Sequence, residues 1–177
     1  MRLFFAALPG PEVRRRLESA ADALRLPLDA RRVPAESFHM TVAFAGEVSQ
    51  AQAAALRAVG AGDRPVAFAV AFTSYEYWHK SEVIVAAAGT CPPNLLDLHR
   101  RLRAEFERVG LVRDAMAFRA HVTLARKVAQ APVLKAMSPF FWRVRALHLV
   151  HSSGSATGSV YTVVDTWPLL DNASRGE

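Results

Sequence analysis

The pattern of hydrophobic and polar positions changes between two periods along the chain. Runs in which apolar residues occupy every position or every second position predict strands, because successive side chains of a strand point to opposite faces. Such runs lie at 2–7, 38–45, 66–75, 83–88, 120–128, 142–151 and 160–167. A loop rich in serine and glycine at 152–158 separates the last two runs.

Apolar residues three and four positions apart predict helices in several intervening segments. One helix is expected at 11–26, where a proline stands at the first helical position. A Ser-x-x-Gln capping box at 49–52 predicts the start of a second helix. Asn94 is expected to cap a third helix that ends at Gly110, and 132–137 is expected to form one helical turn. The fold class is therefore α+β with mainly antiparallel sheets.

Size and composition restrict the classes of protein that fit. The chain has 177 residues, of which 51% are hydrophobic, and this favours a single folded domain over 1–177. No apolar run reaches the roughly 18 residues that cross a bilayer, so we expect a soluble, cytoplasmic protein without membrane contact, monomeric by default. The formal net charge of +6 favours an anionic partner such as a phosphate ester or nucleic acid. One cysteine, Cys91, cannot form an internal disulfide.

Two segments of the chain have the same pattern of residue types. Residues 38–44 and 120–126 both read apolar, His, apolar, Thr, apolar, Ala, and their histidines, His39 and His121, lie 82 positions apart, close to half of the chain. Strict strand alternation places each histidine on one face with the threonine two residues later and the alanine after that. Two lobes that each carry one such strand would bring both His-x-Thr pairs to a common cleft.

This set of side chains fits phosphodiester hydrolysis. A base must deprotonate the attacking water and an acid must protonate the leaving alkoxide, and histidine does either near neutral pH. The hydroxyls of Thr41 and Thr123 can donate hydrogen bonds to the non-bridging oxygens, whose charge must be stabilised in the transition state. A single His-x-Thr on a strand is usually structural, but two copies in the same apolar frame favour catalysis by His39 and His121.

The same residues resemble the two-histidine phosphoesterase superfamily, and within it the bacterial and archaeal RNA 2′,3′-cyclic phosphodiesterases (LigT-like). Segment 34–48 is similar to the first motif of that family with its Phe-x-Gly-Glu-Val turn, and 118–126 is similar to the second. The opening at 2–6 and the close at 149–162 resemble its first strand and last hairpin.

The resemblance implies a bilobal fold built from a duplicated α+β unit, with helices outside, a central cleft and one His-x-Thr motif per lobe. It implies metal-independent hydrolysis of RNA or nucleoside 2′,3′-cyclic phosphates to 2′-phosphomonoesters, with 2′-5′ RNA ligation as an associated activity. It also implies that His39 and His121 are catalytic and that Thr41 and Thr123 bind the phosphate. Sequence leaves open which histidine is the acid. RNA ends or cyclic nucleotides are the expected partners.

Other residues are weaker candidates. Arg126 matches an arginine of the second motif, but strict alternation turns it away from His121, so it binds phosphate only if the strand bulges; otherwise we expect a salt bridge. The aromatic candidates for stacking a base are Phe44, Tyr75, Trp78 and Tyr161. The remaining histidines considered have no metal-ligand spacing, so no metal or cofactor is expected and we interpret them as structural or surface residues: His79, His99, His148 and His151.

Two departures from the family pattern stand out, at Arg119 before the second histidine and in the last hairpin at 155–159, which lacks the Arg or Lys of several relatives. The alternatives are a phosphodiesterase of another small molecule, such as an ADP-ribose cyclic phosphate or a 2′-5′ oligonucleotide, and a non-catalytic RNA-end binder. A metalloenzyme would be revealed by loss of activity with a chelator. The two-histidine mechanism predicts a bell-shaped pH dependence.

Overall fold

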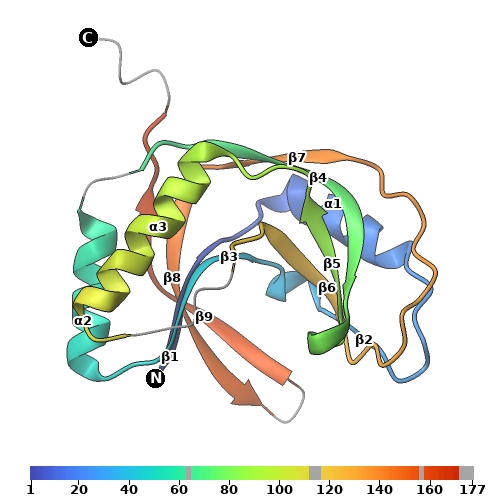
Figure 1. Ribbon diagram of the computed structural model, residues 1–177, viewed down its shortest axis with the longest axis horizontal. Coiled ribbons are helices and arrows are strands. Elements are labelled where there is room, and N and C mark those ends of the chain that lie inside the picture. The colour runs from blue at the N-terminus through green and yellow to red at the C-terminus, as the bar shows by residue number, and fades with distance from the viewer. Residues whose placement is uncertain (63–64, 112–116, 156–157, 172–177) are drawn as a thin grey trace.

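A computed structural model of the chain describes residues 1–62, 65–111, 117–155 and 158–171 (Figure 1). In chain order its elements are β1 (Arg2–Ala7), α1 (Pro11–Asp22), β2 (Arg31–Arg32), the 3-10 turn η1 (Ala35–Ser37), β3 (Met40–Glu47), α2 (Gln50–Ala61), β4 (Phe68–Trp78), the 3-10 turn η2 (His79–Ser81), β5 (Val83–Ala88), α3 (Pro93–Arg108), β6 (His121–Arg126), β7 (Phe140–Val144), β8 (Ala146–Ser155) and β9 (Gly158–Pro168).

The strands form two antiparallel sheets, which confirms the α+β class. The order is β3-β1-β8-β9 in sheet A and β2-β6-β5-β4-β7 in sheet B. The first His-x-Thr motif belongs to sheet A and the second to sheet B, and β3, the edge strand of sheet A, lies beside β6. Within the described residues no ladder joins β3 to β6, so side-chain packing alone connects the two sheets there.

The first predicted strand, β1, is an inner strand of sheet A, between β3 and β8. Leu3 and Phe5 of β1 are fully buried on the face that α2 and α3 cover, where Phe5 stacks on Phe106 of α3 at 6.1 Å between ring centres. Burial of one such side chain stabilises the fold by roughly 1.5–3 kcal/mol. Phe4 and Ala6 point to the opposite face and form a small separate cluster with Val150. The face of sheet A on which Phe4 packs against His39, opposite to the helices, is thus apolar beneath the first histidine motif.

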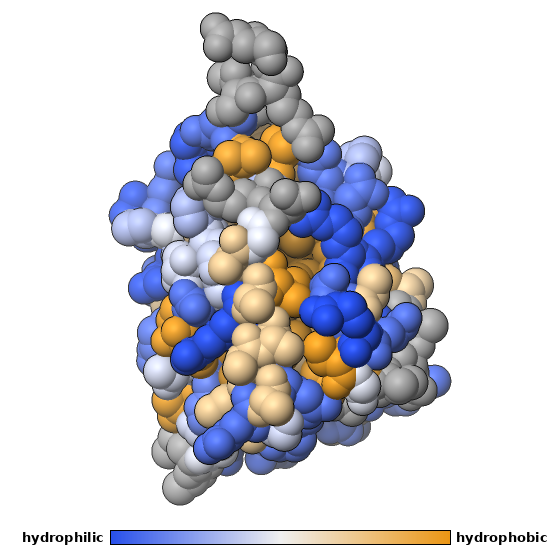
Figure 2. Space-filling view, turned by 90° about the vertical axis from the view of Figure 1, so that its left-hand side faces the viewer, coloured by the Kyte–Doolittle hydropathy of each residue, from blue (hydrophilic) through white to orange (hydrophobic). Residues whose placement is uncertain are grey.

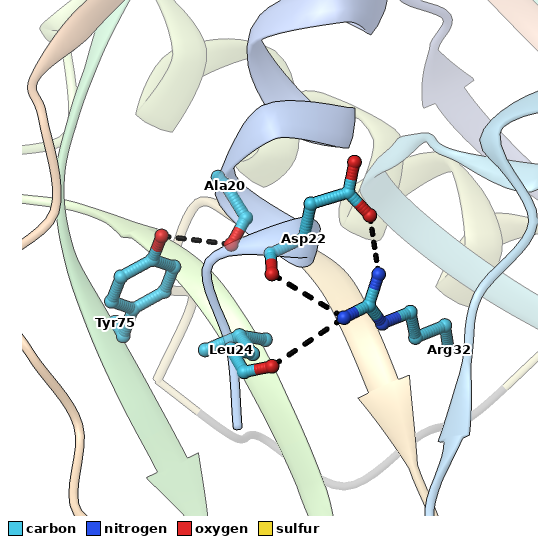
Figure 3. A network of polar contacts seen from close by, with 5 residues as sticks. All are labelled: Ala20, Asp22, Leu24, Arg32 and Tyr75. Atoms are coloured by element: carbon cyan, nitrogen blue, oxygen red, sulfur yellow. Dashed lines mark hydrogen bonds and ion pairs between the residues drawn. The ribbon is translucent and has the colours of Figure 1, made fainter. Parts of the chain in front are cut away.

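Helix α1 packs on sheet B and ends earlier than its apolar pattern predicts. The last helical residue is Asp22, although Leu24 and Leu26 still pack on the core. Arg32 binds this end of the helix: its guanidinium forms an ion pair with the carboxylate of Asp22 and donates to the main-chain carbonyls of Asp22 and Leu24 (Figure 3). The side chain therefore satisfies carbonyl groups that the end of a helix leaves free.

Of the remaining helix predictions, one is correct and two are wrong. The capping box is present, since Ser49 accepts from the main-chain N–H of Gln52 and Gln52 reaches back to Ser49. Asn94 is not the N-cap of α3: the helix begins at Pro93, with Pro92 as the N-cap, because proline is tolerated at the first helical position. The helical turn expected at 132–137 is absent, and these residues are irregular.

The segment 142–151, predicted as one strand, belongs to two. β7 ends at Val144 in sheet B and β8 begins at Ala146 in sheet A, so the chain changes sheets at Arg145. The last hairpin is also tighter than predicted, because β8 continues to Ser155 and β9 starts at Gly158. Positions 156–157 of the predicted loop lie outside the described residues.

The outer face over α2 and α3 is mixed in polarity. Figure 2 shows a band of weakly hydrophobic residues between hydrophilic ones on this side of the molecule, to which α2 contributes exposed alanines. The arginines Arg100 and Arg108 of α3 form ion pairs with acidic residues of their own helix, as expected for a solvated face. Among the described residues no helix combines the length and the apolar character that spanning a membrane would require.

Candidate active site

His39 stands directly before β3, just after the turn η1. Its Nδ1 lies 2.7 Å from the main-chain carbonyl oxygen of Ser37. Because a carbonyl oxygen can only accept, Nδ1 carries a proton and donates it, which leaves the lone pair of the neutral ring on Nε2. The ring packs against Tyr161 and Phe4, with ring centres 4.7 Å and 5.1 Å away. The hydrogen bond and the two rings fix the orientation of the imidazole.

His121 repeats this arrangement as the first residue of β6. Its Nδ1 lies 2.7 Å from the main-chain carbonyl oxygen of Arg119, again two residues earlier in the chain. The indole of Trp78, at the end of β4, packs on the imidazole with 4.3 Å between ring centres. The similarity of the two motifs therefore extends to the hydrogen bond that sets the tautomer, and in both neutral rings the lone pair lies on Nε2.

A β-bulge follows the threonine in both motif strands. Along β3 the residue Val42 has no direct partner on β1, and along β6 Leu124 has none on β5. A bulge inserts one residue and reverses the alternation beyond it. The alanine after each bulge is therefore buried, while Phe44 is 41% exposed and Arg126 is exposed.

The bulges correct the predicted strand faces. Strict alternation placed the motif alanine beside the histidine and turned Phe44 and Arg126 away, and this is wrong for both strands. From the sequence, Arg126 was expected to bind phosphate only if its strand bulges, and the strand does bulge at Leu124. The expected salt bridge is not found: among the described residues no carboxylate lies within salt-bridge distance of Arg126.

Both histidines titrate below the usual value. Burial lowers the pKa of His39, the charges of Arg126 and His121 lower it further, and the hydrogen bond to Ser37 works in the opposite direction. Burial also lowers the pKa of His121, with Arg126 again acting in the same sense. The charge of Arg126 thus lowers the pKa of both rings. Each ring is mainly neutral at neutral pH when no anion is bound.

Only for His121 does a carboxylate raise the pKa, and that group is Glu76. One carboxylate oxygen of Glu76 accepts from the indole N–H of Trp78 at 2.9 Å, and the other accepts from Arg119 at 2.5 Å. The Glu76 side chain thus fixes Trp78, which packs on His121. Sequence reasoning missed Glu76, although it stands two residues before Trp78 and so shares its strand face.

A cavity of about 830 Å³ extends from the first motif along the inner side of the molecule. Five predicted site residues line it together: His39, Thr41, Phe44, Arg126 and Tyr161. Arg2, also in the lining, places its guanidinium over the ring of Phe44 at 5.0 Å. His121, Thr123 and Trp78 are not among the lining residues and stand on sheet B beside it.

Tyr75 does not belong to this site. Its hydroxyl donates to the main-chain carbonyl of Ala20 in α1 at 2.8 Å, so the ring points to the helix side of sheet B (Figure 3). Its predicted role in base stacking is therefore wrong. His99 is structural, because its Nδ1 bonds the carbonyl of Val42 at 2.7 Å and its ring stacks on Phe118.

Within the described part of the chain, no three His, Cys, Asp or Glu side chains are grouped so that they could hold a metal ion. Cys91, before α3, is a free thiol, and burial raises its pKa, so it is mainly protonated at neutral pH. His148 bonds the hydroxyl of Thr166 at 2.9 Å. His148 pairs with Ala6, which also pairs with Thr41, so it stands on the face of sheet A that carries the first motif.

The sequence model described as the 2′-5′ RNA ligase superfamily matches residues 9–156, which is most of the chain. The chain belongs to this superfamily. The expected resemblance to two-histidine phosphoesterases is thereby confirmed.

Two curated relatives match this superfamily member over nearly their whole length. The RNA 2′,3′-cyclic phosphodiesterase of Escherichia coli is 28% identical and covers 95% of this chain and 96% of its own. The RNA 2′,3′-cyclic phosphodiesterase of Thermus thermophilus is 30% identical, with 99% and 93% covered. The solved structure of E. coli LigT complexed with 3′-AMP has a TM-score of 0.88 at 28% identity and covers 95% of this chain and 97% of that one.

Proposed function

We propose that the chain is an enzyme that hydrolyses RNA or nucleoside 2′,3′-cyclic phosphates to 2′-phosphomonoesters without a metal ion. The observation that carries the proposal is the duplicated arrangement of His39 and His121. In each, Nδ1 bonds a carbonyl and Nε2 is left for proton transfer, and the charge of Arg126 acts on both. The names of the relatives support the same reaction.

The reaction needs one proton to be removed and one to be supplied. The oxygen of water attacks phosphorus while the P–O3′ bond breaks, and the 2′-phosphomonoester remains. The Nε2 of one neutral histidine takes the proton of the water, and the Nε2–H of the other, protonated histidine donates to O3′. In the free protein both pKa values are lowered, so neither histidine is mainly protonated at neutral pH. The negative charge of the bound phosphate raises the pKa of an adjacent imidazole, and this favours protonation of the histidine that acts as the acid.

The remaining residues stabilise the charge that develops on the phosphoryl oxygens. Thr41 and Thr123 stand two residues after the histidines, before the bulges, so that their hydroxyls share the face of the imidazoles. Arg126 follows the second bulge onto this face and supplies a positive charge for the non-bridging oxygens. Phe44, Trp78 and Tyr161 are the proposed base-contacting aromatics.

In this proposal the chain acts as one bilobal unit with one motif per lobe, and its partners are RNA ends or cyclic nucleotides. Ligation of 2′-5′ RNA, a cytoplasmic location and a monomeric state stay predictions. A pure RNA-end binder is disfavoured, because binding alone does not require two imidazoles with fixed tautomers. Turnover separates these two functions directly.

Phosphorus NMR of a nucleoside 2′,3′-cyclic phosphate, incubated with the protein and EDTA, tests the proposal. We expect conversion to the 2′-monophosphate by the wild type, and rates reduced by about 10²–10⁴-fold in His39→Ala and in His121→Ala. His79→Ala, which changes an exposed histidine in the turn η2, is the matched control. A folded wild type without turnover would refute the proposal, and activity that EDTA abolishes would refute its metal independence.

A further inference from the structure

Two arginines lie directly opposite each other at the end of sheet B. The short strand β2 pairs antiparallel with β6, so that Arg31 faces Arg126 and Arg32 faces Ala125. Directly opposite residues of a ladder point to the same side of the sheet. Arg31 therefore points to the side of Arg126 and the histidines, and both arginines line the cavity beside His39. Arg32 also contributes to the lining of the cavity, but its guanidinium forms an ion pair with Asp22 of α1 (Figure 3).

Such a pair disfavours folding unless something compensates it, because like charges directly opposite in a sheet repel. Among the described residues no carboxylate lies within salt-bridge distance of Arg31 or Arg126. Lys127 and Arg2 line the same cavity, and Glu36 is the acidic residue among its lining. The cavity therefore has an excess of positive charge that extends from the catalytic centre to Arg31.

We propose that Arg31, with Lys127, binds a second phosphate, the one on the 5′ side of the nucleotide that carries the cyclic phosphate. This inference rests on the proposed function. A 2′,3′-cyclic phosphate ends its strand, so the next phosphate is reached through the 5′ oxygen of the same ribose. Opposite residues of a ladder start about 5 Å apart at Cβ. Arg126 can then contact the cyclic phosphate while Arg31 contacts the neighbour one ribose away.

The second phosphate has two chemical sources. It is either the internucleotide phosphodiester of an RNA strand or the 5′-phosphate of a mononucleotide, and both offer oxygens that guanidinium binds in a bidentate manner. The aromatic groups on the opposite wall, Phe44 and Tyr161, stand where a base can stack, as in sites for single-stranded RNA. Three substrates distinguish the sources: a nucleoside 2′,3′-cyclic phosphate, its 5′-phosphorylated form, and a dinucleotide ending in a 2′,3′-cyclic phosphate.

The test compares kcat/KM for these substrates in the wild type, Arg31→Gln and Arg143→Gln. Arg143 is the matched control, because it lies on β7 at the other edge of sheet B, where it forms an exposed ion pair with Asp171. In Arg31→Gln we expect the ratio of kcat/KM for the dinucleotide to that for the unphosphorylated mononucleotide to fall about 10-fold. The ratio stays unchanged in Arg143→Gln. The Tm of Arg31→Gln is expected at or above that of the wild type, since the repulsion is removed.

The outcomes separate the inference from the proposed function. In the wild type, a kcat/KM that exceeds the value for the unphosphorylated mononucleotide only for the dinucleotide, and that depends on Arg31, assigns the site to an RNA strand. An equal increase in kcat/KM for the 5′-phosphorylated mononucleotide assigns the site to a small nucleotide. Turnover by all variants with an unchanged ratio in Arg31→Gln overturns the inference and leaves the proposed function standing. Equal losses on all substrates together with a lowered Tm assign Arg31 a structural role and also overturn it. A wild type that turns over none of the three refutes the proposed function, and the inference falls with it.

Discussion

Replacing Arg126 with glutamine removes a charge that acts on both histidines. That charge lowers the pKa of His39 and of His121. Without it both pKa values rise, so both limbs of the bell-shaped profile of kcat/KM move to higher pH. The profile of kcat/KM is the appropriate readout, because it reports the groups of the free enzyme.

The same substitution also removes charge stabilisation from the transition state. A preorganised donor aimed at developing negative charge contributes about 10²–10³ to kcat. Arg126 is exposed at the end of β6, so water competes with the phosphate for its guanidinium. We therefore expect the lower end of that range, a loss of about 100-fold at the new optimum, which corresponds to about 2.7 kcal/mol.

Initial rates on a nucleoside 2′,3′-cyclic phosphate between about pH 5 and pH 9 provide the assay. Arg126→Lys is the control, because it keeps the charge but loses the planar fork that binds two oxygens at once. Its limbs should stay near their wild-type positions while its rate falls less. Limbs of Arg126→Gln that stay in place, or that move to lower pH, would contradict the effect of the Arg126 charge on the two rings.

Three further changes test other parts of the structure. Glu76→Gln removes the carboxylate that raises the pKa of His121, so one limb of the pH profile should move to lower pH while the other stays; movement of both would contradict the asymmetry of the pair. The pKa values of His39 and His121 are lower in the folded state than in the unfolded state. The unfolded state therefore binds more protons below about pH 6.5. The two histidines for this reason contribute stability above that pH, and this contribution is lost as the pH falls through their pKa values in the folded state. Urea unfolding of a variant with both histidines changed to Asn should therefore show a smaller loss of stability between about pH 7.5 and pH 5.5 than the wild type, and an equal loss would be evidence against the burial term. Gly60→Ala places a Cβ 2.5 Å from the buried ring of Trp167, and we expect it to lower the free energy of unfolding by about 1–2 kcal/mol despite the better helix propensity of alanine; a more stable variant would show that the ring moves freely.

The sequence predicts the histidines and threonines of the site because their spacing is local. Up to Thr41 and Thr123, strand alternation is enough to place these side chains on one face. Beyond each threonine it fails, because the bulge arises from pairing with another strand, which β1 or β5 supplies. The strand faces of Phe44 and Arg126 therefore could not be predicted from the residue pattern of a single strand.

The boundary between the sheets was hidden for a similar reason. Apolar residues alternate on both sides of the change of sheet at Arg145, and the corner is marked only by a change of phase, because Ala146 and Leu147 are adjacent apolar residues. Short strands are also difficult, since β2 consists of Arg31 and Arg32 alone and has no apolar signal. Both features depend on what lies across the sheet rather than along the chain.

The absence of a ladder between β3 and β6 in the described structure has a mechanical consequence. A hydrogen-bonded ladder would hold the two motif strands at a fixed spacing of about 4.8 Å. Here the separation of His39 and His121 depends on the volumes of the side chains packed between separate sheets. We expect one methylene gained or lost in that layer to change the distance between the two motifs while every residue of the motifs stays the same. In the proposed function, the size of the accepted substrate could then be changed by substitutions in the core.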